Sequence, residues 1–236
     1  MDGLGFLSGA VRGALEKIIS GDPGVFDAIR VSLQVSGTAI IICAALGIPA
    51  ALLLATTRFP GRRLVITLTH TLMAVPTVVV GLFVYAFLTR RSLLGPLDLL
   101  FTREAMILGE VILALPIVIA LAYSALASLD RSVRETAHTL GAGRARVATT
   151  MLWESRLALV AAVTAGFGRV IGEVGVSMIL GGNIAAHTRN VTTAIALETS
   201  KGEFAQALAL GLVLLAVALA VNLLLRSLQG REEGAP

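Results

Sequence analysis

Two ionisable residues inside an apolar stretch are the most unusual chemical feature of this sequence. Arg169 and Glu173 lie four positions apart, so a helix would bring their side chains together on one face. A charged group at bilayer depth costs roughly 2.5 to 3.5 kcal/mol, so the pair should face the protein interior. We interpret it as a salt bridge that fixes the fold. The alternative is that Arg169 lines a pathway and briefly compensates the charge of a passing dianion.

A serine hydrolase site is a second chemistry to consider. Ser177 lies in the same apolar stretch, and the histidines are His70, His138 and His187. Two of them belong to expected loops, and His70 stands among threonines, where a hydrogen-bonded histidine is the simpler interpretation. The sequence also has no His-Glu-x-x-His and no phosphate-cradling loop ending in Gly-Lys-Ser or Gly-Lys-Thr. We therefore expect no catalytic residues, no metal site and no cofactor.

Glycines shape the stretch that holds the charged pair. Gly168 and Gly172 have the spacing that lets two helices approach closely, either within one subunit or between two copies of the chain. Gly181, Gly182 and Asn183 should then end the helix, because glycine and asparagine accept the left-handed backbone of a carboxyl-terminal cap.

Composition places the elements that carry these residues in a lipid bilayer. Of 236 residues, 56% are hydrophobic and 14% charged, which is more apolar surface than one soluble core of this size can hide. The net charge is +4, and the basic residues form short clusters between apolar runs, which favours phospholipid headgroups over nucleic acid as neighbours. Cys43 is the single cysteine, so no disulfide framework exists.

Five apolar stretches are each long enough to cross about 30 Å of hydrocarbon as a helix. Three of them contain a proline, Pro49, Pro76 or Pro116, which should kink the helix. The polar interval at 128–156 is too charged to enter lipid. The expected fold is an all-α membrane protein, one domain over 1–236, with spans at about 29–57, 64–88, 105–127, 157–180 and 204–225.

The two ends of the chain should lie on opposite sides of the membrane. Residues 4–19 carry an apolar helical face, typical of an interfacial amphipathic helix, although a soluble helix packed on the rest of the chain is the alternative. After five crossings, ten basic residues fall on the side of the carboxyl end and eight on the other. This bias predicts a cytoplasmic carboxyl end.

The interval at 128–156 should form a helical coupling segment. Gly141 and Gly143 interrupt helix-favouring residues, and a second helical stretch should start at Arg144. A short exposed helix between two spans can fit a groove of a soluble partner and pass its movement into the membrane. An inert connector is the alternative.

This interval resembles a known motif. Glu135-Thr-Ala137 followed by Gly141 is similar to the EAA loop of permease subunits of bacterial and archaeal ABC importers, in which Glu-Ala-Ala precedes a glycine by the same offset. Thr136 replaces the first alanine, and Met151-Leu-Trp-Glu154 stands where the family usually continues with Ile-x-Leu-Pro.

The fourth span makes the resemblance more specific. Phe167-Gly-Arg-Val-Ile-Gly-Glu-Val-Gly175 and the following Gly181-Gly-Asn183 resemble a segment of molybdate, sulfate and tungstate permeases. The continuation Thr188-Arg-Asn-Val-Thr-Thr-Ala-Ile-Ala-Leu-Glu-Thr-Ser-Lys-Gly-Glu-Phe204 is most similar to the tungstate branch. The likeness extends over essentially the whole chain.

The resemblance implies a transport subunit rather than an enzyme. Its partners would be a second copy of itself, two copies of a separate cytoplasmic ABC ATPase, and an extracytoplasmic binding protein that delivers tungstate, or else molybdate or sulfate. It would be a multi-pass protein of the cell (inner) membrane. We expect ATPase coupling at Glu135, Ala137, Gly141 and Gly143, and we take Arg169, Gly172, Glu173 and Asn183 as pathway candidates.

A proton-coupled secondary transporter is the remaining alternative from the residues alone. Glu110, Arg169 and Glu173 would then form the proton relay. Such a chain would transport by itself and respond to uncouplers, whereas a permease should be inert without its ATPase.

Overall fold

Every regular element of the computed structural model is a helix, throughout the residues that it describes: 5, 8, 9, 11–13, 16, 19–129, 139 and 141–227, with residue 226 described by its backbone alone. The all-α prediction is confirmed. Half of the expected amphipathic segment at 4–19 lies outside the described residues, as do residues 130–138 and 140 of the coupling interval. The elements are α2 (Pro23–Thr56), α3 (Arg62–Leu72), α4 (Thr77–Leu88), the 3-10 helix η1 (Gly95–Leu97), α5 (Arg103–Ala127), α7 (Arg144–Glu154), α8 (Arg156–Ile171), α9 (Gly175–Gly181), α10 (Val191–Ser200) and α11 (Phe204–Ser227).

The first helix begins earlier than its apolar stretch because its start is capped. The Asp22 carboxylate accepts hydrogen bonds from the backbone N–H groups of Gly24 at 2.8 Å and Val25 at 3.3 Å, and Pro23 occupies the first turn. The resulting α2 has 34 residues and is about 50 Å long at 1.5 Å per residue. It therefore extends beyond the hydrocarbon layer.

The second apolar stretch consists of two helices that meet at a sharp bend. α3 and α4 are bent by 105° at the break between Leu72 and Thr77. Pro76 precedes α4 with an extended backbone, and it has no N–H group with which to continue α3. Pro49 and Pro116 lie within the uninterrupted helices α2 and α5, so only Pro76 of the three lies between two helices.

The fourth apolar stretch is also broken and consists of two helices instead of one continuous helix over 157–180. α8 ends at Ile171, and α9 continues at an angle of 61°. Glu173 therefore lies in the break rather than one turn further along the same helix as Arg169. The break allows the Glu173 side chain to cap α9, as described below.

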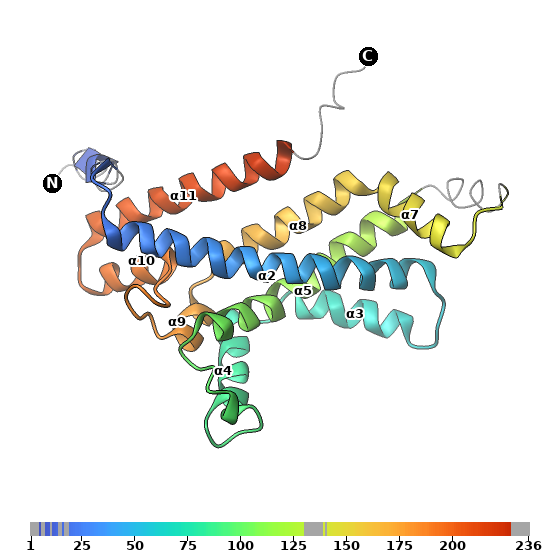
Figure 1. The fold of residues 1–236 in the computed structure, drawn as a ribbon, viewed down its shortest axis with the longest axis horizontal. Helices are drawn as coiled ribbons and strands as arrows, with labels where there is room; N and C mark the ends of the chain where they lie inside the picture. Colours follow the sequence, from blue (N-terminus) through green and yellow to red (C-terminus); the bar gives the residue numbers. More distant parts are fainter. Residues whose placement is uncertain are drawn as a thin grey trace, which may run out of the picture.

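Helix α5 lies at the centre of the bundle and contacts α2, α8, α9, α3 and α4. In Figure 1, α2 runs along the molecule, while α4 points away from that direction. A buried cluster joins α2, α5 and α8 through Cys43, Val118 and Phe167. A second joins α4, α5 and α9 through Val84, Leu113 and Val176. The core thus fixes the position of the α8–α9 break against α5.

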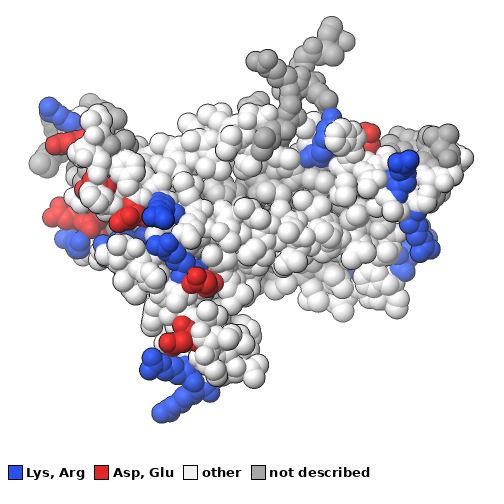
Figure 2. Space-filling model, viewed as in Figure 1, with Lys and Arg blue, Asp and Glu red and all other residues white. Residues whose placement is uncertain are grey.

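The helices have the length and composition of membrane spans. Among the described residues, three helices are long and apolar enough to cross a bilayer, namely α2, α5 and α11, and up to five crossings result if each bent pair counts as one. Figure 2 shows charged side chains gathered at the two ends and on the projection formed by α4, with uncharged surface between them. Such a belt is the surface expected to face lipid.

Helices α5 and α9 approach closely at Gly109, which gives a stability prediction. A Cβ atom there would lie 2.4 Å from Val176 Cγ1 and 2.7 Å from Leu180 Cδ1, and both neighbours are fully buried. Gly109→Ala should therefore destabilise the chain by about 1 to 3 kcal/mol, despite the higher helix propensity of alanine. The thermal unfolding midpoint of the detergent-solubilised chain measures this.

The matched control is Gly211→Ala in α11, where a Cβ atom would meet nothing within 4 Å. That variant should unfold at or above the temperature of the original chain. Equal midpoints for the two variants would contradict the close α5–α9 contact.

Candidate translocation site and coupling loop

The charged pair meets at the break between α8 and α9. Arg169 Nη1 lies 2.9 Å from Glu173 Oε2, and the Glu173 side chain is only 3% exposed. The other carboxylate oxygen, Oε1, accepts a hydrogen bond from the backbone N–H of Val176 at 3.2 Å, at the start of α9. Both oxygens of Glu173 are thus occupied. The pair holds the two halves of the broken stretch in a fixed relation.

Arg169 differs from its partner in exposure. Its side chain is 36% exposed, and one nitrogen of its guanidinium carries the ion pair with Glu173. No further hydrogen bond of this guanidinium occurs among the described residues. Its remaining donors can therefore face an aqueous space beside the break.

The small-residue face of α8 makes no close contact within this chain. Gly168 and Gly172 are exposed, and a Cβ atom at either would meet nothing within 4 Å in the part of the chain that the structure describes. Ala161 and Ala165 continue the same exposed face. Close packing within one subunit was one of the two explanations for the Gly-x-x-x-Gly spacing. The described structure does not support that explanation for this face.

Glu110 on α5 lies near the pair without joining it. Its side chain is fully buried, and neither carboxylate oxygen has a hydrogen-bond partner among the described residues, although the Ser36 hydroxyl on α2 lies close. The described chain contains no hydrogen bond from Glu110 to Arg169 or Glu173. The three residues of the alternative proton relay share one region but form no continuous path in this structure.

Asn183 stands apart from the charged pair, at the other end of α9. Gly182 and Asn183 have positive φ angles of 68° and 53°, so the predicted cap ends the helix at Gly181. The side-chain oxygen of Asn183 accepts a hydrogen bond from Arg189 Nε at 3.1 Å, and its backbone oxygen accepts one from Arg189 Nη2 at 3.3 Å. Asn183 thus shapes a loop rather than contacting the other pathway candidates.

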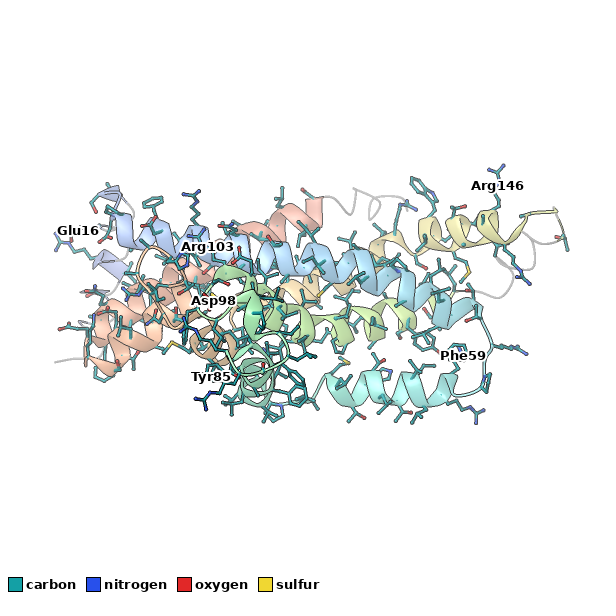
Figure 3. All side chains as sticks on the ribbon, turned by 60° about the horizontal axis from the view of Figure 1, so that its bottom comes forward. Glu16, Phe59, Tyr85, Asp98, Arg103 and Arg146 are labelled. Carbon is teal, nitrogen blue, oxygen red and sulfur yellow. The ribbon has the colours of Figure 1, made fainter. Side chains whose placement is uncertain are left out.

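Arg103 holds this loop to α2, a role that no sequence pattern indicated. Arg103 Nε donates to the carbonyl oxygen of His187 at 2.7 Å, and Nη1 donates to Gln34 Oε1 at 2.6 Å. The residue begins α5, and Figure 3 shows it where α5 and α2 meet. Many arginines lie just before a membrane-spanning stretch, as Arg103 does. The sequence therefore gives no signal that Arg103 joins α5 to both α2 and this loop.

Asn190 forms a buried polar centre behind the α8–α9 break. Its side-chain oxygen accepts hydrogen bonds from the backbone N–H of Thr193 and the hydroxyl of Thr192, each at 2.8 Å, and its Nδ2 donates to Ser177 Oγ at 3.1 Å. Thr192 Oγ1 also lies 2.7 Å from the backbone oxygen of Glu173. The first turn of α10 is thereby tied to the break. An asparagine three residues before a threonine is the cap signal that could have identified it.

The surroundings of Ser177 give no support to the alternative of a serine hydrolase. Ser177 is fully buried and bonds with Asn190, whereas His70 and His187 are exposed. No serine–histidine hydrogen bond occurs in the described chain, and His138 lies outside it. The described residues also contain no group of three side chains that could hold a metal ion.

The coupling interval is described from its glycines onward. Gly141 has a φ angle of +76°, and Gly143 precedes α7, which begins at Arg144 as predicted. Glu135 and Ala137 lie outside the described residues. The interval thus turns at a left-handed glycine shortly before α7.

Comparison with known proteins points to transport. Residues 47–233 match the family model of the binding-protein-dependent transport system inner membrane component. The chain is 40% identical over 224 residues to the tungstate uptake system permease protein TupB of Peptoclostridium acidaminophilum, with 95% of this chain and 98% of that protein covered. It is 38% identical over 226 residues to TupB of Campylobacter jejuni subsp. jejuni, with 96% and 95% covered.

A solved structure shares the fold. A chain of the MetNI methionine ABC transporter, in an inward-facing conformation, superposes with a TM-score of 0.64 at 18% sequence identity. The match covers 89% of the present chain and 95% of the other. The broken stretches α3–α4 and α8–α9 thus occur within a helical arrangement already known in a membrane transporter.

Proposed function

Because this chain belongs to the family of binding-protein-dependent transport system inner membrane components, we propose that it forms the membrane pathway through which tungstate enters the cell. The chain is a transport subunit of an ABC importer, and ATP hydrolysis belongs to a separate subunit. The observation that carries the choice of solute is the identity of about 40%, over almost the full length of both chains, with a protein named for tungstate uptake.

The α8–α9 break borders the pathway in this proposal. Its exposed side presents the remaining guanidinium donors of Arg169 and the bare backbone of Gly172, beside a buried Glu173 that keeps the arginine in place. The ion pair fixes the shape of the break beside the pathway and does not bind the solute, since a tight cationic site would retain the ion that a conduit must release. Asn183 contributes from the far end of α9 by fixing the loop at 183–189.

The exposed small-residue face of α8 supports a homodimer. Ala161, Ala165, Gly168 and Gly172 would allow the same helix of a second copy to approach closely. In a two-fold symmetric dimer both copies present the same face, so the two α8–α9 breaks would flank one central pathway.

The loop before α7 is the proposed contact with the ATPase. Glu135, Ala137, Gly141 and Gly143 would place a short helix in a groove of each of two ATPase copies, on the cytoplasmic side together with the carboxyl end. An extracytoplasmic binding protein would deliver the solute to the opposite side of the cell (inner) membrane. Transport is then a change in which side of the pathway is open, and no bond of the solute is broken.

Uptake into proteoliposomes tests the choice of solute. The chain is reconstituted with its ATPase and binding protein, and the uptake of labelled tungstate, molybdate and sulfate is compared at equal concentrations. We expect tungstate to be taken up at least about tenfold faster at limiting concentration, since each 1.4 kcal/mol of selectivity gives a factor of ten. Equal rates, or faster molybdate or sulfate uptake, would contradict the assignment.

A further inference from the structure

A cavity of about 510 Å³ lies between the end of α2 and the first turns of α7. Its polar rim includes the guanidinium groups of Arg58 and Arg144, and its wall includes Leu52, Leu53 and Val147. A smaller cavity of about 320 Å³ continues from Arg58 along the α2–α3 turn. The walls of the larger cavity are therefore cationic on one side and apolar on the other.

The guanidinium N–H groups of the two rim arginines make no hydrogen bond to the described chain. Arg58 and Arg144 are exposed, and neither makes a hydrogen bond or an ion pair within the part of the chain that the structure describes. Arg62, only four residues from Arg58, is different, because it donates to the carbonyl oxygen of Leu54 at 2.6 Å and to the Tyr123 hydroxyl at 3.1 Å. Arg62 fixes the turn, whereas the rim arginines are available to a ligand.

The two threonine hydroxyls that line the cavity have no free donor for a ligand. Thr56 Oγ1 and Thr57 Oγ1 donate to carbonyl oxygens of their own helix, those of Leu52 at 2.8 Å and Leu53 at 2.5 Å. The strong donors left on the rim are thus guanidinium groups, which bind phosphate oxygens in a two-pronged geometry.

The location of the cavity indicates an amphiphilic ligand. It lies at the end of a spanning helix, where Leu53 leaves 60% of its surface exposed, and the neighbouring Phe59 is 42% exposed. A basic cluster next to exposed apolar side chains at the end of a spanning helix is typical of the membrane–water boundary, where arginines meet anionic headgroups. Figure 2 shows Lys and Arg side chains at this end, and Figure 3 places Phe59 and Arg146 there.

We propose that this cavity binds an anionic phospholipid, with its phosphate on Arg58 and Arg144 and the upper part of an acyl chain against Leu52, Leu53 and Val147. A soluble oxyanion would use the arginines but leave the leucine wall exposed to water. An anionic lipid would contact both the arginines, through its phosphate, and the leucine wall, through its acyl chain. The membrane itself supplies such lipids. The lipid then bridges α2 to the helix that follows the coupling loop.

Lipid retention by the purified full-length chain tests this site. The chain is equilibrated in detergent with equal amounts of phosphatidylglycerol and phosphatidylethanolamine, and bound lipid is counted by native mass spectrometry. The original chain should retain phosphatidylglycerol preferentially. The double variant R58Q/R144Q should bind it about twenty-five-fold more weakly, or about fivefold for each guanidinium removed.

The control is R91Q/R146Q, which removes the same charge from exposed arginines outside the cavity lining. It should retain phosphatidylglycerol like the original chain. Equal retention by R58Q/R144Q, or equal loss in the control, would overturn the proposal. So would equally tight binding of glycerol phosphate, which lacks acyl chains, because the site would then be one for a soluble anion.

Discussion

Arg169→Met should destabilise this chain by about 3 kcal/mol, because it leaves the Glu173 carboxylate buried without its cation. Glu173→Gln should cost only about 1 kcal/mol, since the amide oxygen can still accept the hydrogen bond that begins α9. The arginine left behind in that variant is one-third exposed and can turn toward water. Denaturant midpoints of the purified chain in detergent measure both losses.

The double variant Arg169→Met/Glu173→Gln separates a salt bridge from a pathway cation. Because the buried carboxylate is replaced by a neutral amide, this variant should recover most of the stability lost in Arg169→Met. The two losses of stability should therefore not add. It should also retain most of the tungstate uptake of the original chain, because the pair acts by holding the break. Additive losses would contradict the salt bridge, and a stable double variant without uptake would assign the solute contact to Arg169.

Gly141→Val should reduce binding to the ATPase by about tenfold. Gly141 has a φ angle of +76°, and a β-branched residue there costs roughly 1 to 2 kcal/mol in a turn that must present the coupling helix. Glu135→Lys should abolish binding, because it reverses the charge at the position where the family motif has its glutamate. A pull-down of the detergent-solubilised chain with its ATPase measures both.

The matched control is Gly202→Val, outside the coupling interval. Gly202 has a φ angle of +82°, and a Cβ atom there would meet nothing within 4 Å. This variant carries the same backbone strain and should bind the ATPase like the original chain. If Gly202→Val and Gly141→Val lost binding equally, the loss would not be specific to the turn at Gly141.

Local signals in the sequence predicted several features correctly. Apolar length predicted the all-α fold, and the four-residue spacing predicted the contact between Arg169 and Glu173. Glycine and asparagine at 181–183 predicted the end of α9, because few other residues accept positive φ. Each of these depends only on neighbours along the chain.

The helix breaks could not be predicted in the same way. Pro49, Pro76 and Pro116 are alike in sequence, yet only Pro76 separates two helices at 105°. Tertiary packing decides which proline a helix can accommodate, since neighbouring helices can support the freed backbone groups. The polar contacts of Arg103 and Asn190 link segments that are far apart in the chain. The spacing of neighbouring residues therefore cannot predict them.

The most direct test of the central claim is the energy source for transport. Proteoliposomes containing the chain alone, or the chain with its ATPase and binding protein, are assayed for tungstate uptake with ATP and with an imposed proton gradient. We predict uptake only by the complete assembly, driven by ATP and unaffected by an uncoupler. Uptake by the chain alone along the proton gradient, abolished by the uncoupler, would contradict the account.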